Sequence, residues 1–492
     1  MSREGRLVKH TVILAIGTFF PKLTTFLALP VLTAFLTKTE YGTYDLVVTL
    51  VSLMLPVATM QIQSAAFRFL IGKQDDNQRA KAIITNIYAF IAAVSTIVLI
   101  IGFRLMGSLP LWIRLSICLY YFFDIVSNVS RQVIRGLGRN MDYTVSAIIS
   151  GVGQIAFICL LVMGLHKGLL GGLVALGASE MLSAIYLLYR GKLYRYIAPR
   201  FLSKEVIKEL LGYSWPLIPN SIAQWVIHAS DRLIISWFMG AAANAVYAVA
   251  YKIPSILSLV QTTFNMAWQE NASETAEDTD AAAYYSSMFE WLFNITAGMM
   301  AVLIGITPIL FAIFVRGDYA EAYNHMPILS LGMFFLCLST FWGGIFVAIK
   351  KTKTAGTTTV IAAVVNLVVN ISTIRWIGLY AASVSSLVAY IIMCLSRALS
   401  VQKFMKIRYN VRHIVIVVGM LMAQCFLCFL QNGLLNIVNI VLGLAICFVL
   451  NHKLIRAIFR KKVGMRLKHT GGEKGTAQLS DLPSQDDSNV PG

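Results

Sequence analysis

The chain has 492 residues, of which 57% are hydrophobic and only 13% are charged. Soluble domains carry about 45–50% apolar and about 25% charged residues, so this composition excludes a water-soluble multidomain protein. The net charge of +18 indicates basic cytoplasmic connections of a membrane protein, and no nucleic acid is expected as a partner. All seven cysteines lie inside apolar segments, which argues against a disulfide framework or a metal site.

Apolar segments recur along the chain and predict an all-α polytopic membrane protein of about 14 transmembrane helices. The first six form an N-terminal lobe: Thr11–Leu36, Tyr44–Ile71, Ala82–Ile101, Leu111–Ser130, Tyr143–Met163 and Leu169–Tyr189. The next six form a C-terminal lobe: Leu217–Phe238, Ala245–Trp268, Tyr285–Phe314, Met326–Ile349, Thr357–Thr373 and Leu379–Leu395. The last two form an extra helix pair: Ile414–Leu430 and Leu434–Leu450. The predicted domains are residues 1–200, 201–405 and 406–451, followed by a basic tail, 452–492, that is disordered from His469 onward.

Lysine and arginine are unevenly distributed over the predicted connections. With both termini in the cytoplasm, the inside segments hold 30 of these residues and the outside segments hold 5. Because basic residues favour cytoplasmic loops, we expect a multi-pass protein of the cell membrane with both termini cytoplasmic. Basic and apolar residues alternate between positions 190 and 212 and predict an interfacial helix that joins the lobes.

Features of enzymes are missing from the sequence. The predicted outside connections are short, and the chain contains neither a P-loop nor an HExxH motif. We therefore expect no enzymatic activity and no cofactor.

The two groups of six spans repeat one layout. The first has a span with Pro21, a short turn, and a tyrosine-rich helix start at Glu40 to Tyr44; the second has Pro216 and Pro219 followed by Asn244 to Tyr251. Each group has an even number of spans, so both point the same way through the membrane, as in transporters whose halves move about a central cavity. Chance similarity between apolar segments is the alternative interpretation.

Polar residues follow single faces of four predicted spans, at helical spacings of three and four. Hydrocarbon offers these faces no partner, so they either pack against one another or line a water-filled cavity. Four full-length stripes favour the cavity, and its mainly basic charges suit an anionic cargo such as a lipid-linked pyrophosphate. The predicted cavity residues are Lys22, Asp45, Arg68, Asn220, Gln224, Asp231, Arg232, Tyr247, Tyr251, Lys252 and Asn265.

Each of these residues also has a structural interpretation. Lys22 is placed where a lysine can snorkel to the lipid headgroups. Asp231 and Arg232 are neighbours, and one of them is a candidate for a structural ion pair with Lys252 or Asp45.

Several motifs carry a resemblance to a known family. The chain resembles the oligosaccharide flippases of the multidrug/oligosaccharidyl-lipid/polysaccharide exporter superfamily over nearly its whole length to about Val401. The motifs of the first half are the Glu40-Tyr41-Gly42-x-Tyr44 turn and Ala65-Ala66-Phe67-Arg68-Phe69. The motifs of the second half are Ser214-Trp215-Pro216-Leu217-Ile218-Pro219-Asn220-Ser221-Ile222, Asp231-Arg232-Leu233-Ile234-Ile235, Gly240, Tyr247, Ala250, Lys252-Ile253, Ala267-Trp268 and Tyr319 to Pro327.

The resemblance implies two six-helix lobes that face each other around a central cavity. It implies a cargo of undecaprenyl-pyrophosphate-linked oligosaccharide, moved to the outside in exchange for protons or sodium during surface polysaccharide biosynthesis. A polysaccharide polymerase, glycosyltransferases and membrane lipids are the expected partners. Arg68, Asp231 and Arg232 match charged cavity positions of the family, whereas Lys252 and Lys22 match less closely.

Three alternatives stay open at this stage. The last two spans exceed the usual twelve and resemble the lipid II flippase, so a lipid II or spore-wall precursor is the second candidate cargo. A multidrug antiporter is less favoured, because it would normally use an acidic cation site and an apolar pocket. A membrane-bound polymerase or glycosyltransferase would need a large outside loop or an acidic catalytic pair.

Overall fold

The computed structural model describes residues 16–71 and 77–472, and every regular element in these two ranges is a helix. This confirms the all-α class predicted from the apolar segments. The first half contains a helix over residues 16–27, α2 (Leu29–Phe35), α3 (Lys38–Ala58), α4 (Ile62–Leu70), α5 (Asn77–Leu105), α6 (Leu111–Gly136), α7 (Asn140–Ile158), the π-helix η1 (Cys159–Gly164) and α8 (Gly168–Tyr189). The connection contains the short turns η2 (Leu193–Arg195) and η3 (Pro199–Phe201), α9 (Lys204–Ser214) and η4 (Trp215–Leu217). The remainder contains α10 (Ile218–Met239), α11 (Ala241–Lys252), α12 (Ile256–Glu274), α13 (Ala281–Phe314), α14 (Ala320–Ala348), α15 (Thr352–Ile377), α16 (Tyr380–Val401), α17 (Val411–Phe429) and α18 (Gly433–Gly472).

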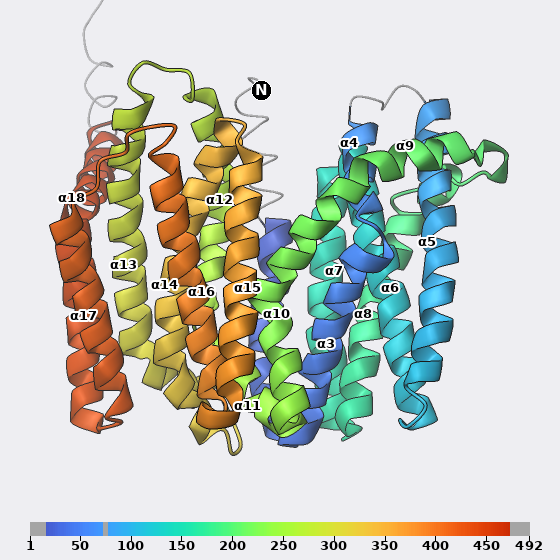
Figure 1. The fold of residues 1–492 in the computed structure, drawn as a ribbon, viewed down its shortest axis with the longest axis horizontal. Coiled ribbons are helices and arrows are strands. Elements are labelled where there is room, and N and C mark those ends of the chain that lie inside the picture. The colour runs from blue at the N-terminus through green and yellow to red at the C-terminus, as the bar shows by residue number, and fades with distance from the viewer. Residues whose placement is uncertain (1–15, 72–76, 473–492) are drawn as a thin grey trace, which may run out of the picture.

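Most of the helices run side by side between two ends of the molecule (Figure 1). We call the end that holds α9 the inner end, after the predicted cytoplasmic location of residues 190–212, and the end that holds Lys38 and Asp318 the outer end. The helix α9 lies across the inner end, roughly perpendicular to its neighbours (Figure 1). It is the segment in which the sequence predicts an interfacial helix.

The number of membrane spans is close to the predicted one. Eleven helices of the described residues are long and apolar enough to cross a membrane, or twelve if the bent pair α11–α12 is one span. The other two predicted spans are α6 and α10, which at 1.5 Å per residue are about 39 and about 33 Å long. Their mean hydropathy is lowered by charged residues, among them Asp124 and Arg131 in α6 and Asp231 and Arg232 in α10. The figure of 14 spans therefore stays a prediction.

Two predicted spans are broken, and each is the second span of its half. The predicted span Tyr44–Ile71 is divided between α3 and α4 because Met60 and Gln61 adopt left-handed backbone angles, with φ of 47° and 58°. The predicted span Ala245–Trp268 is divided between α11 and α12 by a 52° bend. Pro254 lies in that break and has no N–H to continue the helix. The breaks lie at different distances along the spans, after the 21 residues of α3 and the 12 residues of α11, so the internal repeat stays a prediction.

The two halves form separate helix groups that are joined along α3, α10 and α11. In Figure 1 the helices α4 to α8 lie on one side and α12 to α18 on the other, with α3, α10 and α11 between them. The indole of Trp225 on α10 donates to the Oγ of Ser52 on α3 at 3.0 Å. The helices α17 and α18 pack against α13 and α14 at the far edge of the second group.

The C-terminal region departs from the predicted boundaries. The helix α18 continues past Leu450 to Gly472, with a kink at Asn451. Residues 469–472 are thus helical, although the sequence predicts disorder from His469 onward. Residues 473–492, together with residues 11–15 of the first predicted span, lie outside the described part of the chain.

Candidate substrate cavity

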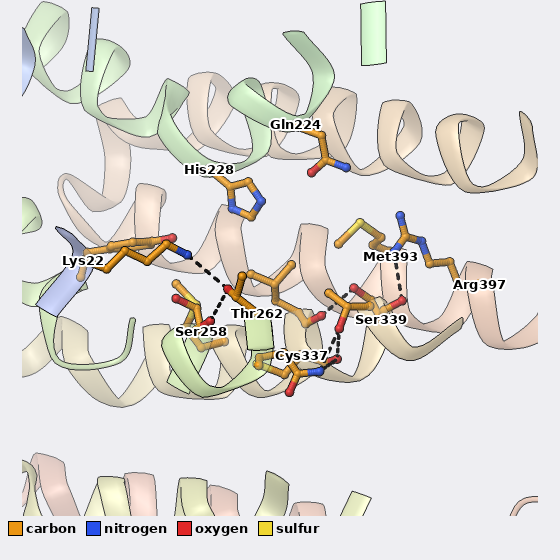
Figure 2. A pocket seen from close by; sticks show the side chains of 14 residues that line it. Lys22, Gln224, His228, Ser258, Thr262, Cys337, Ser339, Met393 and Arg397 are labelled. Atoms are coloured by element: carbon orange, nitrogen blue, oxygen red, sulfur yellow. Dashed lines mark hydrogen bonds between the residues drawn. The ribbon is translucent and has the colours of Figure 1, made fainter. Parts of the chain in front are cut away.

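A cavity of about 320 Å³, here called the central cavity, lies where the first helix meets the second half. Figure 2 shows it with side chains from the first helix, α10, α11, α12, α14 and α16 around it. None of its fourteen lining residues is acidic, and two of them are basic. The lining residues are Lys22, Gln224, His228, Tyr251, Ser258, Gln261, Thr262, Met333, Leu336, Cys337, Ser339, Thr340, Met393 and Arg397.

Lys22 is one of the two basic residues of the central cavity. It lies one residue after Pro21, and its Nζ donates to the Oγ1 of Thr262 on α12 at 3.2 Å, so it connects the two halves. A second cavity of about 180 Å³ is lined by both Lys22 and Lys252 and contains no acidic residue. The predicted cavity residues Lys22, Gln224, Tyr251 and Lys252 are thus gathered around two neighbouring cavities that share Lys22.

Asp45 and Arg232 form an ion pair between the halves. The Nε of Arg232 on α10 lies 2.8 Å from the Oδ2 of Asp45 on α3, and both side chains are almost completely buried. The guanidinium also lies over the ring of Tyr251, 5.0 Å from its centroid. This pairing neutralises both charges, so Arg232 adds little positive charge to the cavity. Asp45 lines a further cavity of about 190 Å³ together with Lys252.

Asp231 points away from the cavity and into the second half. Its carboxylate accepts hydrogen bonds from the hydroxyl of Tyr247 at 2.8 Å, from Asn370 Nδ2 at 2.7 Å and from the hydroxyl of Ser386 at 2.5 Å. These donors come from α11, α15 and α16, and all of them are buried. The carboxylate of Asp231 is therefore surrounded by neutral hydrogen-bond donors, and Tyr247 is one of them.

Arg68 lies in a separate place. It is an exposed residue of α4 and lines a pocket of about 500 Å³ at the inner end, together with Arg135 and Gln132 of α6. Asn220 is exposed near the start of α10, and Asn265 is half-buried on α12. None of these three predicted cavity residues lines the cavities that contain Lys22.

Arg397 is a cavity residue that the sequence prediction did not identify. The predicted span ends at Leu395, so Arg397 is counted there among the basic residues of a cytoplasmic loop. In the structure α16 continues to Val401 and Arg397 is buried, with 6% of its surface exposed. The available signal was the uninterrupted helical pattern through Val401, because arginine is a good helix former and ends only the apolar segment.

A buried ion pair in the first half was also missed. Arg131 on α6 pairs with Glu180 on α8, and Glu180 accepts from the hydroxyl of Ser150 at 2.6 Å. The count of basic residues places Arg131 in a cytoplasmic connection, although its spacing also continues the polar face of Tyr120, Asp124 and Asn128. In the structure α6 continues to Gly136. Both corrections have one cause, since each predicted span ends just before an arginine that follows an apolar segment, although buried partners allow the helix to continue.

Comparisons with known proteins agree with this architecture. The polysaccharide biosynthesis protein family matches residues 7–269, which is more than half of the chain, and the MatE family matches residues 216–372. No curated protein matches the sequence significantly.

Several solved structures share the fold. The lipid II flippase MurJ in an inward closed conformation is similar with a TM-score of 0.68 at 14% identity, covering 91% of this chain and 100% of that one. A multidrug resistance MATE transporter in an inward-facing conformation has a TM-score of 0.60 at 14% identity, covering 77% and 96%. A MATE transporter in complex with MaL6 has a TM-score of 0.58 at 13% identity, covering 80% and 94%. The chain belongs to the polysaccharide biosynthesis protein family, within the multidrug/oligosaccharidyl-lipid/polysaccharide exporter superfamily whose flippase fold it shares.

Proposed function

We propose that the protein is a flippase that carries an undecaprenyl-pyrophosphate-linked oligosaccharide across the cell membrane for surface polysaccharide biosynthesis. The observation that carries this proposal is the charge of the two cavities that share Lys22. They are lined by Lys22, Lys252 and Arg397 and by no carboxylate. Hydroxyls and amides provide the other polar groups, which suits a sugar chain that follows a pyrophosphate.

Ion coupling is part of the proposal. An ionisable residue inside a membrane protein is a candidate for an ion pathway, and Asp231 is a buried carboxylate with three neutral donors. We expect export to depend on a proton or sodium gradient. Separate ionophores for the two gradients, applied to cells that export the polysaccharide, distinguish which ion is used.

A lipid II or spore-wall precursor is the second candidate cargo. It is favoured by the similarity to the lipid II flippase MurJ, which covers 91% of this chain. A multidrug antiporter is supported by the match of residues 216–372 to the MatE family, but a drug cation would meet two lysines and an arginine in these cavities. As a transporter, the protein would act without catalytic residues.

The test is complementation of a strain that lacks its oligosaccharide flippase, with the amount of protein in the membrane measured alongside. The double variant Lys22→Gln and Lys252→Gln should lower surface polysaccharide about tenfold or more, because the phosphates lose both ammonium groups. The control is Lys38→Gln at the outer end, which should export normally. Full export by the double variant at normal membrane abundance contradicts the proposal.

A second strain distinguishes lipid II from the oligosaccharide as the cargo. Rescue of a strain depleted of its lipid II flippase, without rescue of the polysaccharide strain, would assign lipid II as the cargo. Protection against cationic drugs without either rescue would indicate an antiporter.

A further inference from the structure

Arg397 has a chemical environment unlike that of the other deeply buried arginines. Its Nε donates to the Oγ1 of Thr358 at 3.1 Å and its Nη1 to the carbonyl oxygen of Ser339 at 2.9 Å. Its Nη2 donates to the Oγ1 of Thr359 at 2.9 Å and to the carbonyl oxygen of Ala355 at 3.5 Å. These acceptors are neutral, and none of the ion pairs found among the described residues includes Arg397. The side chain is held in place, but its charge is not compensated.

Two other arginines in the helix bundle show the usual arrangement. Arg131 is paired with Glu180 and Arg232 with Asp45. A buried charge without a counterion is strongly unfavourable in a protein interior, and still more so at membrane depth. The unpaired Arg397 therefore requires either a bound anion or another function that offsets this cost.

The guanidinium lies at the wall of the central cavity, where an anion has access to it. Arg397 lines this cavity, and no lining residue is acidic. Figure 2 places Lys22 and Arg397 at opposite ends of the cavity, with His228 and Gln224 along one side between them. Gly343 on α14 leaves room for the arginine, since a Cβ at this position would lie only 3.1 Å from its Nη1.

We propose that Arg397 binds a negatively charged substituent, a carboxylate or a phosphate, on the sugar part of the cargo. The inference rests on the proposed flippase function and adds that the oligosaccharide is acidic. The lysine end of the cavity takes the pyrophosphate, and the arginine end takes a charge further along the sugar chain. A guanidinium has five N–H groups, and the four hydrogen bonds of Arg397 leave one of them, on Nη1, for an oxygen of the carboxylate or phosphate.

A purely structural function for Arg397 makes a different prediction. The four hydrogen bonds connect α16 to α14 and α15, so the side chain also joins helices. If joining helices were its only function, its loss would affect every cargo to the same extent. A cargo-binding function affects acidic cargo more than neutral cargo.

The experiment measures flipping of two lipid-linked oligosaccharides by the purified protein in proteoliposomes. The two cargoes share the lipid and the pyrophosphate and differ in one sugar, which is glucose in one and glucuronate in the other. We expect the wild type to flip the glucuronate cargo about tenfold faster, and Arg397→Gln to reduce this ratio to about one. Arg397→Lys should keep an intermediate ratio, because it restores the charge without the hydrogen bonds that hold the guanidinium in place.

A matched pair of glycine variants tests the position of the guanidinium at constant charge. Gly343→Ala should lower the ratio, because the added methyl group would lie 3.1 Å from Nη1 and shift the guanidinium by a few tenths of an ångström. Gly356→Ala on the neighbouring α15 is the control, since a Cβ there meets nothing within 4 Å, and its ratio should equal that of the wild type.

Three outcomes would overturn the inference. One is a wild-type protein with no preference between the two cargoes, and another is Arg397→Gln with the preference retained. The third is an equal loss of both cargoes in Arg397→Gln, which would mean that Arg397 joins helices or binds the shared pyrophosphate. If the wild type flips neither cargo, the proposed function itself fails, which is a result distinct from these three.

Discussion

The outer and inner ends of the interface between the halves are built differently. At the outer end the backbones touch: a Cβ added to Gly42 on α3 would lie 1.7 Å from the carbonyl oxygen of Ala241 on α11. Asn244 reinforces this contact by donating to the carbonyl oxygen of Gly42 at 2.9 Å. At the inner end, Gln61 donates through its Nε2 to the Oγ of Ser221 at 2.8 Å.

This difference indicates that the outer end is the more tightly closed end in the structure. Backbone contact leaves no space at the outer end, whereas the side chains at the inner end can separate by changes of rotamer. A carrier that alternates between its two sides must break the outer contact once in each cycle. The comparison can be tested by changing one contact at a time, starting with the closest one.

The largest effect is expected for Gly42→Ala. The new methyl group has no space against Ala241, so the closed outer end should be strongly disfavoured and export should fall about tenfold or more. A single cysteine at Ser258, in an otherwise cysteine-free protein, reports the change. Its labelling by a membrane-impermeant maleimide added outside the cell should increase.

The control for this variant is Gly102→Ala on α5, where an added Cβ meets nothing within 4 Å. It should export and label like the wild type. Normal export by Gly42→Ala would show that the outer ends of the halves do not need to approach as closely as they do in this structure.

Part of this interface could be predicted from the sequence, and part could not. Helical spacing predicts a polar face that contains Gln224, and the structure places Gln224 at the central cavity. The same spacing adds Asp231 to that face, although its partners Asn370 and Ser386 lie on helices about 140 and 155 residues away along the chain. A periodic pattern within one helix has no information about such partners.

The breaks in the spans show a second limit. Nothing in the sequence around Gln61 predicts the left-handed backbone found there, because glutamine rarely adopts this conformation. The second break is easier to anticipate, since Pro254 lies within it. Hydropathy likewise ends a span before Arg397. It cannot predict that this arginine is buried, because the burial depends on hydrogen-bond acceptors from α14 and α15.

The next largest effect is expected for the ion pair between Asp45 and Arg232. Asp45→Asn would leave the guanidinium of Arg232 buried without its counterion, at a cost of about 3–5 kcal/mol. Thermal unfolding of the detergent-purified protein should therefore occur at a clearly lower temperature. The double variant Asp45→Leu and Arg232→Leu should recover much of the loss, because it removes both charges. A double variant less stable than Asp45→Asn would mean that the charges have a function beyond pairing with each other.

A smaller effect is expected at the inner end. Ser221→Ala removes the acceptor of Gln61 and little else, and a single hydrogen bond of this kind contributes about 0.5–1.5 kcal/mol. The inner end should open more often, and labelling of the Ser258 cysteine from the inner side, measured in inverted vesicles, should rise about two- to tenfold. Unchanged labelling would show that other contacts keep the inner end closed.

The smallest effect is expected for Lys38 and Asp318, which also join the halves at the outer end. Their Nζ and Oδ2 atoms are 2.8 Å apart, but the side chain of Asp318 is 89% exposed. Exposed ion pairs contribute about 0–1 kcal/mol and are screened by salt. Asp318→Asn should therefore leave export and the unfolding temperature nearly unchanged. A loss of export as large as that of Gly42→Ala would mean that surface charge, and not the backbone contact at Gly42, keeps the outer end closed.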